Sequence, residues 1–131
     1  MTVPQFVQHW IDPAAHDLEA ARVNRQAGFY DVCIVLCQQS GEKYLKALWA
    51  HQQAATPPRT HDLQQLAQTV GAPTSVISAA AGLVAQYLRA RYPDAAQTTP
   101  YTQYTVADAD QHLQFAEELQ QWVLTQLPST P

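Results

Sequence analysis

Residues 30–51, YDVCIVLCQQSGEKYLKALWAH, carry the pattern that decides the fold. Apolar and small side chains recur there at three- and four-residue spacing, which predicts a long helix with a buried stripe formed by Tyr30, Cys33, Ile34, Cys37, Gly41, Tyr44, Leu45 and Leu48. Val32 and Trp49 add apolar surface outside this stripe. A helix that is apolar on more than one side is central in its bundle or pairs with a second chain. Gly41 costs about 1 kcal/mol relative to alanine inside a helix, which indicates a close approach by another helix.

Helix signals also precede this segment. Asp12-Pro13 resembles an N-cap followed by proline at the first helical position, so the first long helix is expected to begin there. Any earlier residues would form a short extra turn that carries Trp10. Gly28 is expected to follow the end of this helix, since glycine favours the left-handed conformation found after helix ends.

Three more helices are predicted downstream from caps and apolar spacing: residues 61–70 capped by Thr60, residues 74–91, and a last helix that begins at the capping box of Thr105 with Asp108 and ends near Pro128. No segment is typical of a strand. The predicted fold is therefore all-α, an up-down bundle of four main helices with one or two short extra helices.

The chain has 131 residues and 47% apolar residues, which predicts one domain over residues 1–131 with a flexible tail at 128–131. No apolar run is long enough to span a bilayer, and the N-terminus has no basic start followed by an apolar block. We therefore expect a cytoplasmic protein with no membrane contact and no signal peptide.

The formal net charge of −4 is unevenly distributed. All seven basic residues lie within residues 1–91, whereas residues 92–131 carry five acids and no Lys or Arg. This is not the broad basic surface of a general DNA binder. A small anion site remains compatible with it, and the acidic last helix could cover a basic patch on this chain or on a partner.

Cysteine usage argues against a metal site or a disulfide. Cys33 and Cys37 are four residues apart on the predicted helix, which favours two buried apolar side chains in a cytoplasmic chain. No second Cys or His pair lies nearby at ligand spacing. We expect neither a metal nor a cofactor.

Charged residues of the second helix have a simple structural interpretation. Glu42 and Lys46 are four residues apart in the favourable order, and their pairing would suffice for a solvated helix face. Lys43 lies on a different side of the helix and could bind a phosphate at the end of the bundle where Arg91 is expected.

The corner Arg91-Tyr92-Pro93-Asp94 brings a cation, a phenol and a carboxylate to one helix end, because proline stops the helix. Arg91 and Asp94 could form an ion pair that fixes the loop. Alternatively, Arg91 could bind a phosphate and Tyr92 could stack on a base, with Asp94 in the same ligand site. His61, near a helix start, could pack against the bundle or accept a proton if it lay close to Arg91.

Taken together, these segments resemble the HEPN domain family of small α-helical prokaryotic proteins, from about Trp10 to Val123. The resemblance rests on five motifs in order: Asp17-Leu18 with Ala20-Ala21, Gly28-x-Tyr30, Gln38-Gln39-x-x-Glu42-Lys43-x-x-Lys46-Ala47, Thr60-His61-Asp62-Leu63, and Arg91-Tyr92-Pro93-Asp94. It implies a homodimer that often acts with a minimal nucleotidyltransferase as toxin and antitoxin.

Active members of the family are metal-independent ribonucleases that use an Arg followed four to six residues later by His. This chain contains no such pair. The leading hypothesis is thus a dimeric module that binds a nucleotide, RNA or a nucleotidyltransferase, with Lys43, Arg91, Tyr92 and Asp94 as ligand-binding residues. The alternative is a ribonuclease with a rearranged site, in which His61 and Arg91 are catalytic. A third hypothesis is a purely interacting partner that docks through its acidic last helix.

Overall fold

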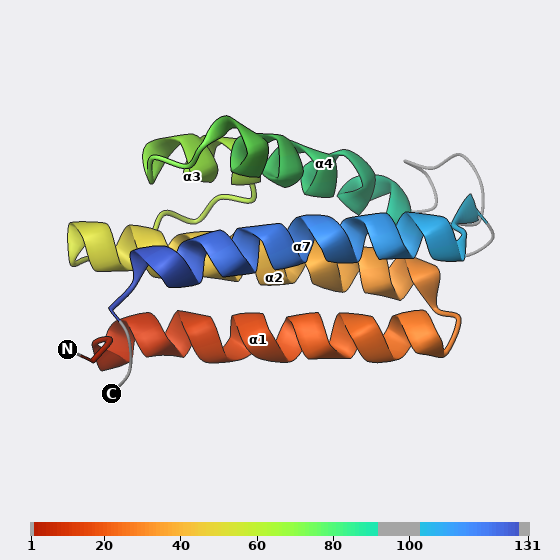
Figure 1. The fold of residues 1–131 in the computed structure, drawn as a ribbon, viewed down its shortest axis with the longest axis horizontal. Coiled ribbons are helices and arrows are strands. Elements are labelled where there is room, and N and C mark those ends of the chain that lie inside the picture. Colours follow the sequence, from red (N-terminus) through yellow and green to blue (C-terminus); the bar gives the residue numbers. More distant parts are fainter. Residues whose placement is uncertain (1, 92–102, 129–131) are drawn as a thin grey trace.

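A computed structural model describes residues 2–91 and 103–128, with side chains described at 2–84 and 103–128. Its helices are α1 (Gln5–Gln26), α2 (Tyr30–Gln53), α3 (Leu63–Thr69), α4 (Thr74–Arg91) and α7 (Val106–Gln126). No strand occurs in these described ranges. The four long helices run alternately up and down, and short α3 leads into α4 (Figure 1). This confirms the predicted all-α bundle.

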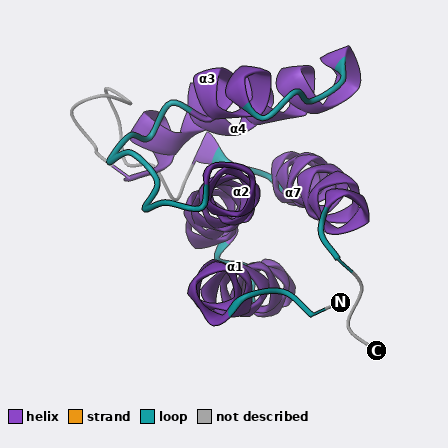
Figure 2. Ribbon diagram, turned by 90° about the vertical axis from the view of Figure 1, so that its left-hand side faces the viewer, coloured by secondary structure: helices purple, strands orange, loops and turns teal. Residues whose placement is uncertain are grey.

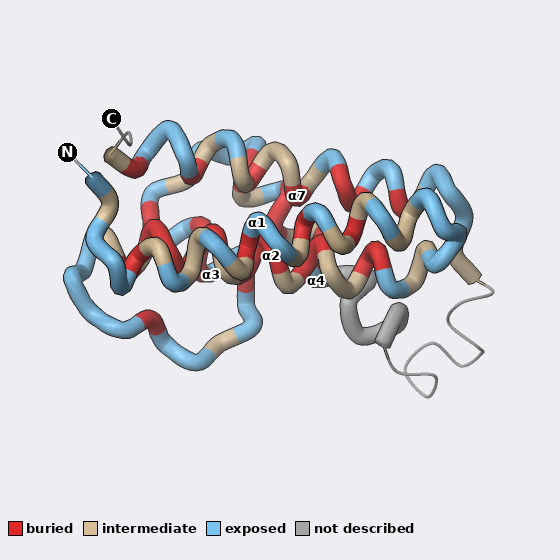
Figure 3. The backbone as a smooth tube through the Cα atoms, turned by 90° about the horizontal axis from the view of Figure 1, so that it is seen from below, coloured by how far each residue is buried: buried red, intermediate tan, exposed pale blue. Residues whose placement is uncertain are grey.

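Helix α2 lies at the centre of the bundle, between α1 on one side and α3 with α4 on the other, and α7 lies beside it (Figure 2). It contacts all four of these helices. The buried positions of the helices face the interior (Figure 3). The wide apolar surface of α2 is therefore used within one chain, and most of the predicted stripe, from Cys33 to Leu48, is buried.

Gly41 lies where three elements meet α2. A Cβ atom at this position would lie 2.9 Å from Leu83, 3.1 Å from Leu119 and 3.3 Å from Leu63. These leucines belong to α4, α7 and α3, respectively. The prediction of a close helix approach at Gly41 is confirmed, and the missing side chain lets three helices reach α2 at one level.

The predicted start of the first helix is wrong. Helix α1 begins at Gln5, and Pro13 lies inside it rather than at its first turn. Proline inside a helix removes one backbone hydrogen bond and costs about 3 kcal/mol. The earlier turns persist because they bury Val7 and pack Trp10 against the core. The predicted end is confirmed, since Gly28 follows the helix with a φ of 87°.

The cap of the short helix also differs from the prediction. Helix α3 begins at Leu63, and the side chain of Asp62 accepts a hydrogen bond from the backbone of Gln65. Thr60 instead accepts from the backbone N–H of Asp62 and shapes the turn before the cap. As a result, His61 lies outside the helix, where its ring can reach α2.

The last helix begins as predicted. Thr105 accepts a hydrogen bond from the backbone of Asp108, and the Asp108 carboxylate accepts one in return from the backbone of Thr105, which completes the capping box. Val106 is 39% exposed because it occupies the first turn beside the cap. Among the described residues, no helix is long and apolar enough to cross a membrane.

Candidate functional site

Polar side chains from three successive turns of α2 meet inside the bundle. Gln38 is almost fully buried, and Glu42 and Lys46 are each only 6% exposed. The prediction of a solvated face for the Glu42–Lys46 pair is wrong. Residues from elsewhere in the chain cover the pair: His61 bonds to Glu42, and the indole of Trp10 lies against Lys46.

Glu42 is the centre of this cluster. One of its oxygens, Oε2, accepts a hydrogen bond from Lys46 Nζ at 3.0 Å. The other, Oε1, accepts from Gln38 Nε2 at 3.3 Å and lies 2.7 Å from His61 Nδ1. Gln39 Nε2 donates to Gln38 Oε1 at 2.9 Å and so orients that amide. A buried charge is tolerated only when it is paired and hydrogen-bonded, and both carboxylate oxygens meet this condition.

His61 connects the buried cluster to the surface, since 76% of its side chain is exposed. A carboxylate only accepts hydrogen bonds, so Nδ1 is the ring nitrogen that carries hydrogen in the neutral imidazole. The other ring nitrogen, Nε2, then holds the lone pair. This arrangement of an exposed imidazole backed by a buried carboxylate can accept a proton or attack an electrophile.

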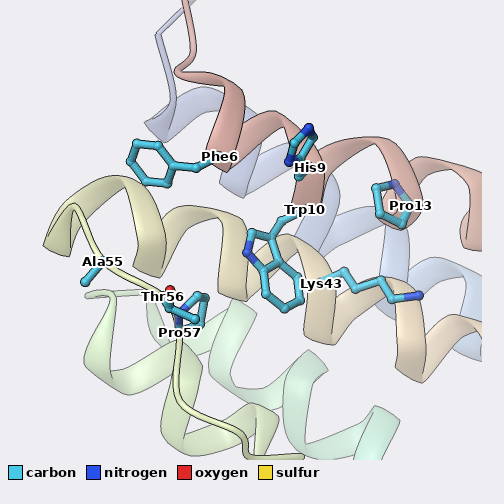
Figure 4. Close-up of a pocket in the computed structure, with 8 residues that line it drawn as sticks. All are labelled: Phe6, His9, Trp10, Pro13, Lys43, Ala55, Thr56 and Pro57. Carbon is cyan, nitrogen blue, oxygen red and sulfur yellow. The ribbon is translucent and has the colours of Figure 1, made fainter.

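Lys46 also contacts Trp10 of α1, with its Nζ atom 5.7 Å from the ring centroid. This distance falls within the range of a cation–π interaction. The contact links the cluster to a surface cavity of about 350 Å³ between α1 and the loop after α2, with Trp10 and Phe6 on one side and Pro57 on the other (Figure 4). The first turns of α1, predicted as a separate short turn before Pro13, therefore supply part of a pocket.

Lys43 lies at the edge of the same cavity, and its ammonium points away from Phe6 and Ala55 (Figure 4). It forms an ion pair with Asp17 of α1. Lys43, which the sequence predicts to bind phosphate, thus joins α1 to α2 in this structure. Any anion that binds Lys43 would compete with or extend this pair.

The structure does not describe the side chains of the other predicted ligand-binding residues. Arg91 is the last residue of α4, and its side chain is outside the described part of the chain. Tyr92 and Asp94 lie outside the described residues altogether. The meeting of His61 with Arg91 accordingly stays a prediction. Helix α4 ends towards the α1–α2 turn (Figure 1), whereas His61 bonds to the middle of α2.

An acidic groove of about 420 Å³ runs along α7 and includes Asp110, Glu117 and Glu118. At its edge, Arg25 of α1 binds Asp110 through two hydrogen bonds, at 2.8 and 3.2 Å. The hydrogen bond and the charge of Arg25 hold the pKa of Asp110 below its ordinary value. The acidic last helix therefore meets at least one basic residue of its own chain.

The two cysteines are free and buried, in agreement with the prediction. The pKa of the Cys37 thiol is raised, chiefly by its hydrogen bond with Cys33 and secondly by its burial, so the thiol stays uncharged. Within the described residues, no group of three or more His, Cys, Asp or Glu side chains could hold a metal ion.

Sequence reasoning identified His61 but missed its buried partners. The available signal was the four-residue spacing of Gln38, Glu42 and Lys46, which puts them on one helix face. Their burial depends on Trp10 and on the loop before α3, whose positions no local pattern specifies.

A family model and solved structures of known proteins resemble this chain over most of its length. The model of the HEPN domain family matches residues 7–126. The crystal structure of ST0689, described as an archaeal HEPN homologue, is 34% identical, covers 93% of this chain and 98% of its own, and has a TM-score of 0.80. The crystal structure of TT1696 from Thermus thermophilus is 28% identical over 92% of this chain and 98% of its own, with a TM-score of 0.83. No curated protein matches the chain.

Proposed function

The chain belongs to the HEPN domain family, and on this premise we propose that it is a cytoplasmic, homodimeric module that binds a nucleotide or RNA as one half of a toxin–antitoxin-type pair. The observation that carries this proposal is the buried Gln38–Glu42–Lys46 cluster with exposed His61. Polar groups inside a small bundle cost stability, and such exceptions concentrate at functional sites.

A minimal nucleotidyltransferase is the proposed partner. The acidic groove with Asp110, Glu117 and Glu118 supports this part of the proposal, because it would complement a basic surface. The net charge of −4 favours a compact ligand site over a long nucleic-acid track. The proposed ligand is therefore one nucleotide, free or at the end of an RNA.

Changing Arg91 to alanine is expected to weaken nucleotide binding about tenfold or more, because a guanidinium–phosphate hydrogen bond is worth about 1.5–3 kcal/mol. Lys43→Ala should act in the same direction. The measurement is calorimetric titration of wild type and variants with ATP and with a short single-stranded RNA.

Arg22→Ala is the matched control, since Arg22 is a surface cation paired with Glu19 within α1. It should bind like the wild type. Far-ultraviolet circular dichroism checks that each variant is folded. Absence of any binding by the wild type would reject the proposal, and unfolding of Arg91→Ala without a ligand effect would give the corner a structural role.

The second candidate function is metal-independent RNA cleavage, and the hydrogen bond between His61 and Glu42 favours it. An imidazole oriented by a carboxylate can take the proton of a 2′-hydroxyl, while Arg91 would stabilise charge on phosphorus. For this function, His61 and Arg91 would have to take the place of the family's Arg–His motif, which the sequence lacks.

If this candidate is right, His61→Ala should reduce RNA cleavage in the presence of EDTA about 100-fold or more, the usual contribution of a general base. His9→Ala removes another exposed histidine and should leave the rate unchanged. A substrate with 2′-deoxyribose at the cleavage site should resist. Equal cleavage by wild type and His61→Ala would eliminate this function.

A further inference from the structure

His61 differs from the other exposed histidines of the chain. Its Nδ1 atom is held 2.7 Å from a buried carboxylate oxygen, and its ring remains largely in solvent. His9 and His16 are also exposed, but within the described residues their rings have no hydrogen-bond partner. In His61 alone of these three, one nitrogen is fixed as the donor and the other is left as the nucleophile.

The carboxylate behind His61 is itself rigid. Glu42 is fixed by Lys46 on one oxygen and by Gln38 on the other, and all three residues lie on one face of α2. The imidazole thus rests on a preorganised anion that does not need to move when charge develops on the ring. A surface carboxylate would instead be solvated and mobile.

We propose that His61 Nε2 is a phosphoryl-acceptor site that takes a phosphoryl group from an acyl phosphate. The Nε2 lone pair forms the N–P bond, and the bond between phosphorus and the bridging oxygen breaks. The electron pair of that bond leaves with the carboxylate product. The ring keeps its Nδ1 hydrogen and gains a positive charge, which lies against the Glu42 carboxylate.

This geometry suits phosphoryl transfer for two reasons. The Nδ1 hydrogen bond keeps Nε2 unprotonated in the neutral ring, which is the form that attacks. The His61 side chain is 76% exposed, so the ring admits a hydrated phosphate without burying its charge. The phosphoryl group carries about −1.5 to −2 charges, only partly offset by the positive ring, so the modification adds negative charge to the loop before α3 and changes how this surface meets an acidic or basic partner.

The proposal is independent of nucleotide binding and of RNA cleavage. A histidine that acts only as a base would leave no covalent adduct, whereas an acceptor keeps the phosphoryl group after the donor product has left. Failure of either proposed function would therefore leave the phosphoryl site to be decided by its own experiment.

The experiment treats the full-length protein with acetyl phosphate and, separately, with phosphoramidate. Peptide mass spectrometry measures the rate at each histidine, and ³¹P NMR identifies the modified nitrogen. His61 is expected to react at least about tenfold faster than His9 in the same molecule, because one charge-assisted hydrogen bond is worth at least that factor. The adduct should be the Nε2 isomer.

Glu42→Gln should lower the rate at His61 to that of His9 without changing the rate at His9. If this variant does not fold, the comparison of His61 with His9 within the wild-type protein still decides the question. Equal rates at the two histidines, or an Nδ1 adduct at His61, would overturn the proposal.

Discussion

Replacing Glu42 with leucine is expected to lower the free energy of unfolding by about 3–5 kcal/mol, the usual cost of removing one partner from a buried ion pair. Lys46 would keep its charge at 6% exposure, and it would lose its acceptor at 3.0 Å. The Gln38 amide and the His61 ring would lose the same acceptor. Urea unfolding followed by circular dichroism measures the change.

The double variant Glu42→Leu/Lys46→Met tests the cause. It removes both charges and keeps the volume, so it should recover most of the lost stability, since buried ion pairs are often replaceable by apolar groups. Glu19→Leu is the surface control and should change stability by less than about 0.5 kcal/mol. A loss below about 1 kcal/mol for Glu42→Leu would contradict the buried arrangement.

The ion-pair cluster explains why part of the site escaped sequence analysis. Glu42 and Lys46 have the spacing of an exposed helix pair, and that spacing is identical in a buried pair. Their environment is decided by Trp10, which α1 brings over Lys46, and by His61, which lies 19 residues from Glu42 along the chain. Only the tertiary arrangement of α1, α2 and the loop before α3 distinguishes the two cases.

Local sequence patterns predict helix bounds and caps correctly where one strong signal acts alone. The bounds of α4 and the capping box at Thr105 agree with the sequence because proline, glycine and cap residues act on adjacent backbone. The predicted start of α1 is wrong because two sequence signals conflict there. Pro13 favours a helix start, whereas burial of Val7 and packing of Trp10 favour a longer helix, and packing prevails.

The position of α2 at the centre of the bundle leads to the second large effect. Gly41→Leu is expected to destabilise the protein by about 3 kcal/mol, because overpacking a tight core forces side chains from their preferred rotamers. Even a Cβ atom would lie 2.9 Å from Leu83 Cδ1 and 3.1 Å from Leu119 Cδ2. The rest of a leucine side chain would push α4 and α7 away from α2. Urea unfolding gives the loss.

A graded series separates overpacking from helix propensity. Gly41→Ala gains about 1 kcal/mol in propensity, and the atoms it crowds are ends of leucine side chains that can rotate, so its net change should stay within about 1 kcal/mol. Leu83→Ala combined with Gly41→Leu exchanges large for small across the α2–α4 contact and should be more stable than the sum of the single losses predicts. Additive losses would show that the two side chains do not share this space, in which case Gly41 would not be what allows α4 to approach α2.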